Sequence, residues 1–132
     1  MYKCPKPKFR IRLEQGKSQF YDVFVFPFKK QMLAYFFRHG GSGSGHFLAI
    51  TESWMIVHGK RVSPCIGRIL ICEKACRVGI VSHECTHAAT FWAEAQKKDV
   101  LRKDNEWFCT VQGELVRQFW NGWARTCLKK KR

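Results

Sequence analysis

The chain has 132 residues, of which 45% are hydrophobic and 14% aromatic, so it can bury one core and is not compositionally disordered. Lysine and arginine number 24, against 10 aspartates and glutamates, giving a net charge of +14. That excess excludes an acidic solvating protein and favours anionic partners. No apolar run approaches the about 18 residues that span a membrane, and no secretion-type apolar stretch follows the basic segment 1–12. We expect a single soluble, intracellular (cytoplasmic) domain over residues 1–132, with a basic, flexible tail at residues 125–132.

The seven cysteines indicate free thiols. Their number is odd and they occur without a visible secretion signal, so a disulfide framework is not expected. Cys72 and Cys76 are separated by three residues, a spacing that is only a weak zinc signal. We therefore expect these thiols to pack as small apolar side chains.

The first half of the chain predicts a hairpin followed by a short helix. Apolar and charged residues alternate over Phe9–Leu13, which is the period of a half-buried strand. A turn signal separates this segment from Phe20–Phe28, whose aromatic and β-branched residues predict a second strand paired with the first. Lys29–Arg38 predicts a helix with one apolar side. Gly40–Gly45 predicts a flexible loop, and it lacks the GK[ST] ending of a phosphate-binding loop.

The second half predicts three short strands and two longer helices. The strands are expected at His46–Ile50, at Trp54–His58 and, fully buried, at Ile66–Cys72, with a turn at residues 59–61. One helix is expected to begin within residues 75–78 and to end near Gln96. A last helix, capped by Asp104 or Asn105, is expected to end near Ala124. The predicted fold class is α+β.

Residues 83–87, His-Glu-Cys-Thr-His, form the pattern HExxH. Histidines four positions apart project from one face of a helix, so His83 and His87 can reach one metal ion. Glu84 lies beside them and can accept a proton from a water on that metal. About 0.01 chance matches are expected from this composition, so the pattern predicts a zinc site. Cys85 points away from the histidine face and is expected to pack rather than to bind metal.

A catalytic zinc site usually has three protein ligands and one open position. No histidine follows His87, so the third ligand has to be sought among the downstream carboxylates. Glu94 lies about 10 Å further along the same helix, which is too far. Asp99 lies in the connection between the helices, and Asp104 is a candidate helix cap.

Glu106 is the leading candidate for the third ligand. It lies in the first turn of the last helix and can point at the metal if that helix crosses the HExxH helix. Gly113, seven residues further on the same face, permits a close approach of the two helices. We rank Glu106 ahead of Glu114 and Asp104, although the helix dipole alone also favours an acidic residue at position 106.

These motifs resemble known peptidase families. HExxH with eighteen residues between His87 and Glu106 resembles the gluzincin arrangement, which implies that His83, His87 and Glu106 bind zinc and that Glu84 is the general base. The stretch HECTHAATFW at residues 83–92 is similar to the active helix of SprT-like proteases, which act on DNA–protein crosslinks. Together with NEWFCTVQGELVRQF it resembles small, often phage-encoded zincin-like proteins. The resemblance covers about residues 65–120 and implies a compact zincin-like domain, with a small sheet packed on the HExxH helix and a C-terminal helix crossing it.

The residues imply metal-assisted hydrolysis of a protein or peptide substrate. Zinc would lower the pKa of a bound water to about 7 and polarise the carbonyl, and Glu84 would pass the proton of the water to the leaving amine. The strand Ile66–Cys72 would offer its backbone to an extended peptide if it lies at a sheet edge. Stabilisation of the oxyanion could come from Tyr35, His46 or His58, among which the sequence does not select.

The basic surface supports a second interpretation, a nucleic-acid-associated protein whose metal is structural or whose peptidase site is inactive. Lysines and arginines gather at residues 3–12 and again at residues 125–132, where they could bind phosphate groups. Trp107, Trp120 and Trp123 could stack on bases, although their helical spacing is also that of core residues. Both interpretations hold if nucleic acid brings a protease to its substrate.

Overall fold

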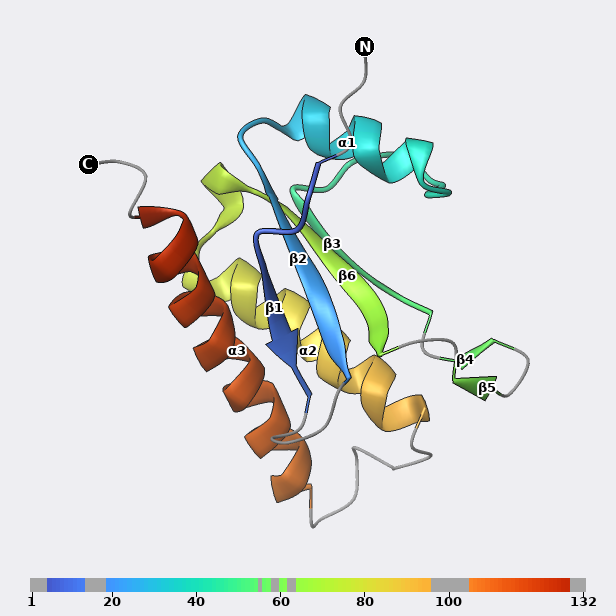
Figure 1. The fold of residues 1–132 in the computed structure, drawn as a ribbon, viewed down its shortest axis with the longest axis vertical. Helices are drawn as coiled ribbons and strands as arrows, with labels where there is room; N and C mark the ends of the chain where they lie inside the picture. Colours follow the sequence, from blue (N-terminus) through green and yellow to red (C-terminus); the bar gives the residue numbers. More distant parts are fainter. Residues whose placement is uncertain are drawn as a thin grey trace.

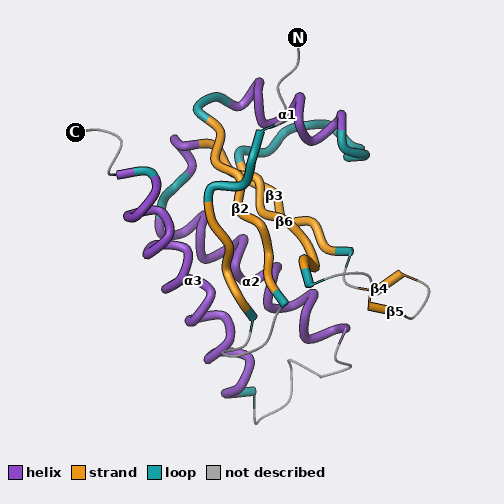
Figure 2. Tube along the Cα trace, in the orientation of Figure 1, coloured by secondary structure: helices purple, strands orange, loops and turns teal. Residues whose placement is uncertain are grey.

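The computed structural model describes residues 5–13, 19–54, 56–57, 60–61, 64–95 and 105–128. Within them the chain is a compact α+β fold with a four-stranded mixed sheet, a small two-stranded ladder and three α-helices (Figure 1, Figure 2). The strands are β1 (Phe9–Arg12), β2 (Phe20–Phe26), β3 (Ala49–Ser53), β4 (Ile56–Val57), β5 (Lys60–Arg61) and β6 (Cys65–Cys72). The helices are α1 (Lys29–Arg38), α2 (Val78–Ala95) and α3 (Glu106–Thr126), with a 3-10 turn, η1, at Glu73–Ala75. The predicted α+β class is confirmed.

The sheet has the strand order β1-β2-β6-β3. The predicted hairpin is confirmed, since β1 pairs antiparallel with β2 and Phe9 lies opposite Val23. β6 pairs parallel with β2 and antiparallel with β3, so it is an interior strand. Its central residues are 0% exposed, as expected for a strand with neighbours on both sides and both faces covered. The prediction that this strand could pair with a peptide as a sheet edge is therefore wrong, and the edge beside it is β3.

Helices cover the two faces of the sheet. On one face, α2 crosses behind the strands in Figure 1 and α3 packs against β1 and α2. Contacts across this interface include the hydroxyl of Tyr21, which donates to the carbonyl of Ala88 at 3.2 Å, and the edge-to-face rings of Phe9 and Phe119. The strand residues next to these in the sequence point to the opposite face of the sheet, because side chains alternate along a strand. There α1 covers one end of the sheet, with Tyr35 packed on the rings of Phe24 and Phe26.

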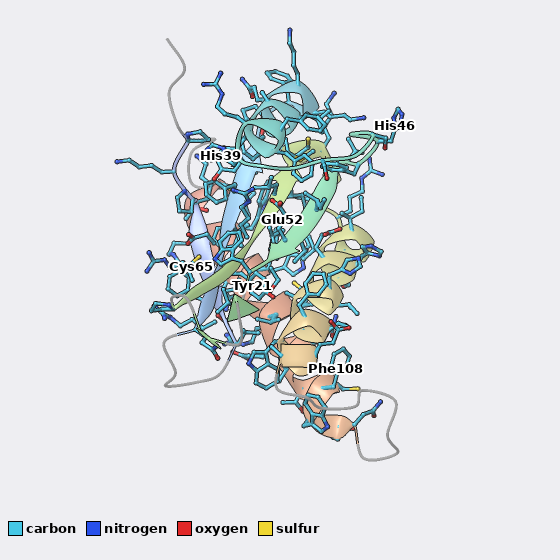
Figure 3. All side chains as sticks on the ribbon, turned by 90° about the vertical axis from the view of Figure 1, so that its right-hand side faces the viewer. Tyr21, His39, His46, Glu52, Cys65 and Phe108 are labelled. Carbon is cyan, nitrogen blue, oxygen red and sulfur yellow. The ribbon has the colours of Figure 1, made fainter. Side chains whose placement is uncertain are left out.

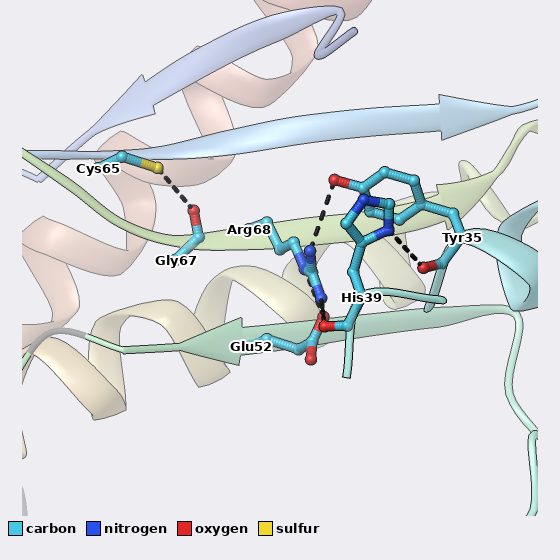
Figure 4. Close-up of polar contacts among 6 residues, drawn as sticks. All are labelled: Tyr35, His39, Glu52, Cys65, Gly67 and Arg68. Atoms are coloured by element: carbon cyan, nitrogen blue, oxygen red, sulfur yellow. Dashed lines mark hydrogen bonds and ion pairs between the residues drawn. The ribbon is translucent and has the colours of Figure 1, made fainter. Parts of the chain in front are cut away.

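A buried arginine joins α1 to the face of the sheet away from α2 (Figure 4). Arg68 of β6 is only 8% exposed, and its Nε donates to Oε1 of Glu52 at 2.6 Å. Its two terminal nitrogens donate to the hydroxyl of Tyr35 and to the carbonyl of His39. These bonds satisfy the buried charge, and they fix the end of α1 over β6 and β3.

The predicted helices are confirmed with small shifts at their ends. α1 has the predicted bounds, α2 ends one residue before the predicted Gln96, and α3 continues to Thr126. The helix therefore includes the first two residues of the predicted tail, while residues 129–132 lie outside the described residues. None of the helices described is both long enough and apolar enough to cross a membrane.

The strands between α1 and β6 differ from the prediction. Instead of strands at His46–Ile50 and Trp54–His58, β3 occupies Ala49–Ser53, where it pairs with residues Gly67–Ile71 of β6. The predicted turn at residues 59–61 is partly a strand, because Lys60 and Arg61 form β5 and pair with β4. Pairing with a distant strand decides these boundaries, and local hydrophobic alternation does not contain that information.

Gly122, rather than Gly113, allows α3 to pack closely. A Cβ at Gly122 would overlap the ring of Phe9, whereas a Cβ at Gly113 would meet no atom within 4 Å. The prediction that Gly113 permits close approach is therefore wrong, because this residue is on the exposed side of α3. Next to this contact, the side-chain amide of Gln118 exchanges hydrogen bonds with the backbone N–H and carbonyl of Arg12, so α3 covers the edge of β1.

Candidate metal centre

The sequence of α2 places the two histidines of the HExxH pattern on its exposed side. Val81, Cys85, Ala88, Ala89 and Trp92 are buried and form a single helical stripe toward the sheet and α3. Glu84 lies at the border of this stripe and is 5% exposed. His83 and His87 lie beyond it and are exposed. The helix period therefore gives a buried carboxylate beside two solvent-accessible imidazoles.

The two imidazoles converge on one point. Their Nε2 atoms are 3.0 Å apart, and the rings meet edge to face at a centroid distance of 4.6 Å. The ring of His87 is also stacked on Phe91, which limits its rotation. Two nitrogen ligands of a tetrahedral zinc ion, each about 2.0–2.1 Å from the metal, lie about 3.3 Å from one another. The observed separation is that of a hydrogen bond between the two rings, and it is about 0.3 Å shorter than the ligand spacing, so the pair is able to take two positions of such a site after a small adjustment.

Glu84 is held in place by β3. Its Oε1 accepts a hydrogen bond of 2.8 Å from the hydroxyl of Thr51, and the same hydroxyl lies 3.1 Å from the backbone carbonyl of Glu84. Its Oε2 lies 4.0 Å from Nε2 of His83. One carboxylate oxygen is thus anchored by Thr51, and the other faces the histidines. Sequence reasoning missed Thr51, because its role depends on the long-range placement of β3 against α2.

An open cavity of about 530 Å³ lies beside His83 and Glu84. It is formed by the start of α1, the loop before β3 and the first turns of α2. Its lining residues are Lys29, His46, Phe47, Leu48, Ala49, Gly79, Ile80, His83 and Glu84. Figure 3 shows His46 on that loop, at the upper end of the molecule in this view. The volume lies within the range of about 300–1,000 Å³ that is usual for ligand sites.

The structure separates the three residues that the sequence offered for oxyanion stabilisation. His46 lines the same cavity as His83. Tyr35 lies on the other side of the sheet, where its ring packs on Phe24 and its hydroxyl accepts from Arg68. His58 lies outside the described residues. No local signal points to Lys29, which begins α1 and lies 54 positions before His83.

The described residues contain no group of three or more His, Cys, Asp and Glu side chains that could hold a metal ion. Glu106, the predicted third ligand, is therefore not brought together with His83 and His87. The side-chain amide nitrogen of Gln112 on α3 lies 3.4 Å from the hydroxyl of Thr86 on α2, so these two residues are side by side across the two helices. Glu106 lies six residues before Gln112, about 9 Å further along α3. Figure 3 accordingly shows nearby Phe108 at the lower end of the molecule, opposite His46.

Among the described residues, no other carboxylate considered from the sequence completes a metal site with His83 and His87. Glu114 forms an ion pair with Arg117 on the same helix, and the hydrogen bond from Arg117 lowers the pKa of its carboxyl group. Glu94 is exposed on α2, more than two turns beyond Glu84. Asp99 and Asp104 lie outside the described residues.

The cysteines of this region pack as predicted. Cys85 is 0% exposed, and its burial raises the pKa of the thiol to about 12. Cys72 is buried with its sulfur 3.9 Å from that of Met32, and the thiol of Cys76 donates to the carbonyl of Cys72. The prediction that Cys85 is a packing residue is confirmed.

No protein-family model, curated protein or solved structure matches this chain.

Proposed function

We propose that this chain is a zincin-like, metal-dependent peptidase, in which His83 and His87 bind zinc and Glu84 is the general base. The observation that carries the proposal is the convergence of the two Nε2 atoms, 3.0 Å apart, beside a buried carboxylate whose Oε2 lies 4.0 Å from Nε2 of His83. Neutral imidazoles and a carboxylate are the ligands and the base that zinc hydrolases use. The cavity beside them leaves room for a substrate.

The side chains have separate roles in this proposal. A bound zinc ion would polarise the carbonyl and make a water acidic enough to lose a proton near neutral pH. Oε1 of Glu84 is occupied by the hydroxyl of Thr51, so Oε2 is the oxygen that takes this proton. As the water oxygen bonds to the carbonyl carbon and the C–N bond breaks, Glu84 gives the proton to the leaving amine. The net reaction consumes one water and regenerates Glu84.

An extended peptide is the substrate that the neighbouring backbone favours. β3 is the last strand in the order of the described sheet, and its residues contact α2. The backbone N–H of Cys72 donates to the carbonyl of Leu48, and the backbone N–H of Trp54 donates to the carbonyl of Ile66, at the two ends of the β3–β6 pair. Because bonded and non-bonded pairs alternate in an antiparallel ladder, the backbone groups of Ala49, Thr51 and Ser53 point away from β6. A peptide added along this edge would pass directly beside Glu84.

The third protein ligand remains a prediction from the sequence. Glu106 is the residue that the resemblance to gluzincins implies, and it begins α3, about 9 Å along that helix from the residue that contacts Thr86 of α2. A zinc ion on two histidines would need a further protein ligand to be held as tightly as a three-ligand site. The variants that separate Glu106 from Glu114 are given in the Discussion.

Substitution of Glu84 tests the proposed function. We expect Glu84→Gln to keep the fold and the bound zinc while losing about 10²–10⁴-fold in peptide hydrolysis, which is the usual contribution of a general base. The measurement is cleavage of a mixed peptide library with added zinc, read by mass spectrometry. Glu94→Gln, an exposed position on the same helix, is the matched control and is expected to retain activity. Full activity of Glu84→Gln would remove this residue from the mechanism.

A second candidate function is association with nucleic acid, and one surface feature favours it. Lys6, Lys8, Arg10 and Arg12 are all exposed along β1 and the segment before it. The guanidinium groups of Arg10 and Arg12 lie over the ring of Phe20, at 4.1 and 5.6 Å from its centroid. DNA or RNA binding that weakens steeply with salt and is unchanged in Glu84→Gln would support this function independently of hydrolysis.

A further inference from the structure

The cavity beside the two histidines contains a basic side chain that the hydrolytic mechanism does not use. Lys29, the first residue of α1, lines the cavity together with His83 and Glu84 and is half-buried. The other walls are largely apolar and come from residues 47–49 and Ile80. A lysine in this position can lay its alkyl stem along apolar surface and bring its ammonium group to a ligand in the cavity.

Lys29 has no acidic partner among the described residues. The ion pairs there join other side chains, and the carboxylate of Glu84, which shares the cavity, is engaged by Thr51 and faces His83. Lys29 is half-buried as a residue, and a carboxylate brought by a ligand would supply its ammonium group with a charge-assisted hydrogen bond. Within the described residues, Lys29 is therefore not already paired with a carboxylate.

The surrounding backbone also favours negative charge. Lys29 begins α1, and Gly79 and Ile80 belong to the first turn of α2, so two helices begin at this cavity. Neither first turn contains an acidic residue. The partial positive charges of the two helix starts are thus not compensated by their own side chains, and they add to the charge of Lys29.

We propose that this cavity binds a carboxylate of the peptide substrate and that Lys29 is the residue that selects it. The inference rests on the proposed function, because it treats the cavity as the subsite next to the bond that is cleaved. The apolar walls accommodate the stem of the residue, and Lys29 pairs with the charge at its end. Two sources supply this chemistry: the side chain of a glutamate or aspartate, and the free carboxylate at the end of a peptide.

Equilibrium binding tests the inference without requiring turnover. The probes are three tripeptides: acetyl-Ala-Glu-Ala-amide, acetyl-Ala-Gln-Ala-amide, and acetyl-Ala-Gln-Ala with a free terminal carboxylate. Dissociation constants are measured by NMR titration of the full chain carrying Glu84→Gln, so that the peptides are not consumed. We expect one carboxylate peptide to bind about tenfold or more tightly than the uncharged one, as for a charge-assisted hydrogen bond. The peptide that shows the gain identifies the source of the carboxylate.

Two lysine variants in the same background separate a specific pair from general attraction to a basic protein. Lys29→Met is expected to abolish the preference. Lys30→Met removes the same charge from an exposed neighbour that does not line the cavity and is expected to retain it. Equal affinity for all three peptides, or a preference that survives Lys29→Met, would overturn the inference.

The outcomes also distinguish this inference from the proposed function. A preference that depends on Lys29, in a protein whose wild type cleaves no peptide of the library, would retain the carboxylate site and reject the peptidase. Cleavage by the wild type without a preference for carboxylates would do the reverse.

Discussion

Thr51 illustrates how one hydroxyl connects the sheet to the proposed chemistry. It is 8% exposed, and its hydroxyl lies within hydrogen-bond distance of both the side chain and the backbone carbonyl of Glu84. Without this donor, the Glu84 carboxylate, in a residue that is 5% exposed, would lose the only hydrogen bond that it accepts within the described residues. Burying a charged group without a partner is costly, so Thr51 is a positioning residue for Glu84.

We predict that Thr51→Val lowers the free energy of unfolding by about 1–3 kcal/mol, which is the cost of leaving a buried polar group unsatisfied. Valine has a similar volume, so the loss would not reflect a cavity. Urea denaturation measures the change. Thr51→Ser keeps the hydroxyl and should recover most of the stability. A loss confined to Thr51→Ser, with Thr51→Val as stable as the wild type, would assign the effect to packing of the methyl group instead.

The thiols give a second prediction at the scale of single residues. Burial raises the pKa of the Cys85 thiol to about 12, so at pH 8 this group is almost entirely protonated and inert, whereas Cys109 is exposed. We expect iodoacetamide at pH 8 to modify Cys109 in the native protein and Cys85 only after unfolding, as read by peptide mass mapping. Modification of native Cys85 at the rate of Cys109 would contradict its buried position.

Among single residues, the sequence predicted those that are neighbours along the chain and missed those that come from distant elements. His83, Glu84 and His87 follow from the helix period, because their mutual placement is local. Thr51 and Lys29 come from β3 and α1, and only the packed sheet brings them to α2. A single sequence carries no signal for such contacts.

Among the helices and strands, the packing of α3 on β1 depends on one small residue. Gly122 faces the ring of Phe9, which is itself packed edge to face against Phe119 and cannot move freely. We predict that Gly122→Ala destabilises the protein by about 1–3 kcal/mol through overpacking. Gly113→Ala, on the exposed side of the same helix, should instead stabilise by about 0.5–1 kcal/mol, because alanine favours the helix.

Thermal or urea denaturation of the two glycine variants measures both effects on one helix. Opposite signs would confirm the orientation of α3 that the structure gives. A stabilising Gly122→Ala, or a strongly destabilising Gly113→Ala, would require α3 to be rotated about its axis.

The relation of α3 to α2 also bears on the proposed third metal ligand. Gln112 of α3 contacts Thr86 of α2, which lies next to His87 in the sequence. Glu106 lies six residues before Gln112, about 9 Å away along α3. This arrangement predicts that Glu106→Ala and Glu114→Ala bind zinc equally well, as measured by competition with a chromogenic chelator. Weaker binding confined to Glu106→Ala would instead support the ligand predicted from the sequence, and α3 would then have to lie nearer to the histidines.

Element prediction from the sequence succeeded where the signal is local. The bounds of α1 and the paired strands β1 and β2 follow from apolar periodicity. The position of β3 did not, because it is set by the pairing of Ala49–Ser53 with β6. The interior position of β6 is likewise a property of the assembled sheet, so its hydrophobic run could not distinguish a central strand from an edge.

At the scale of the whole molecule, the candidate site lies where the outer strand β3, the helix α2 and the cavity meet. α3 covers the edge of β1 through Gln118, while β3 is the other edge strand and runs beside the HExxH helix. The net charge of +14 would draw an anionic substrate toward the molecule. The fold thus brings the outer strand β3, the residues of the proposed hydrolytic mechanism and a cavity lined by Lys29 close together.

The most direct test of this account is the zinc content of the purified protein, determined by elemental analysis for the wild type, His83→Ala and His87→Ala. His39→Ala is the matched control, since His39 stacks on Tyr35 on the other side of the sheet. We predict one zinc per chain in the wild type and the control, and loss of zinc in both site variants. No zinc in the wild type even after zinc is added, or full retention in both site variants, would contradict a metal centre on α2.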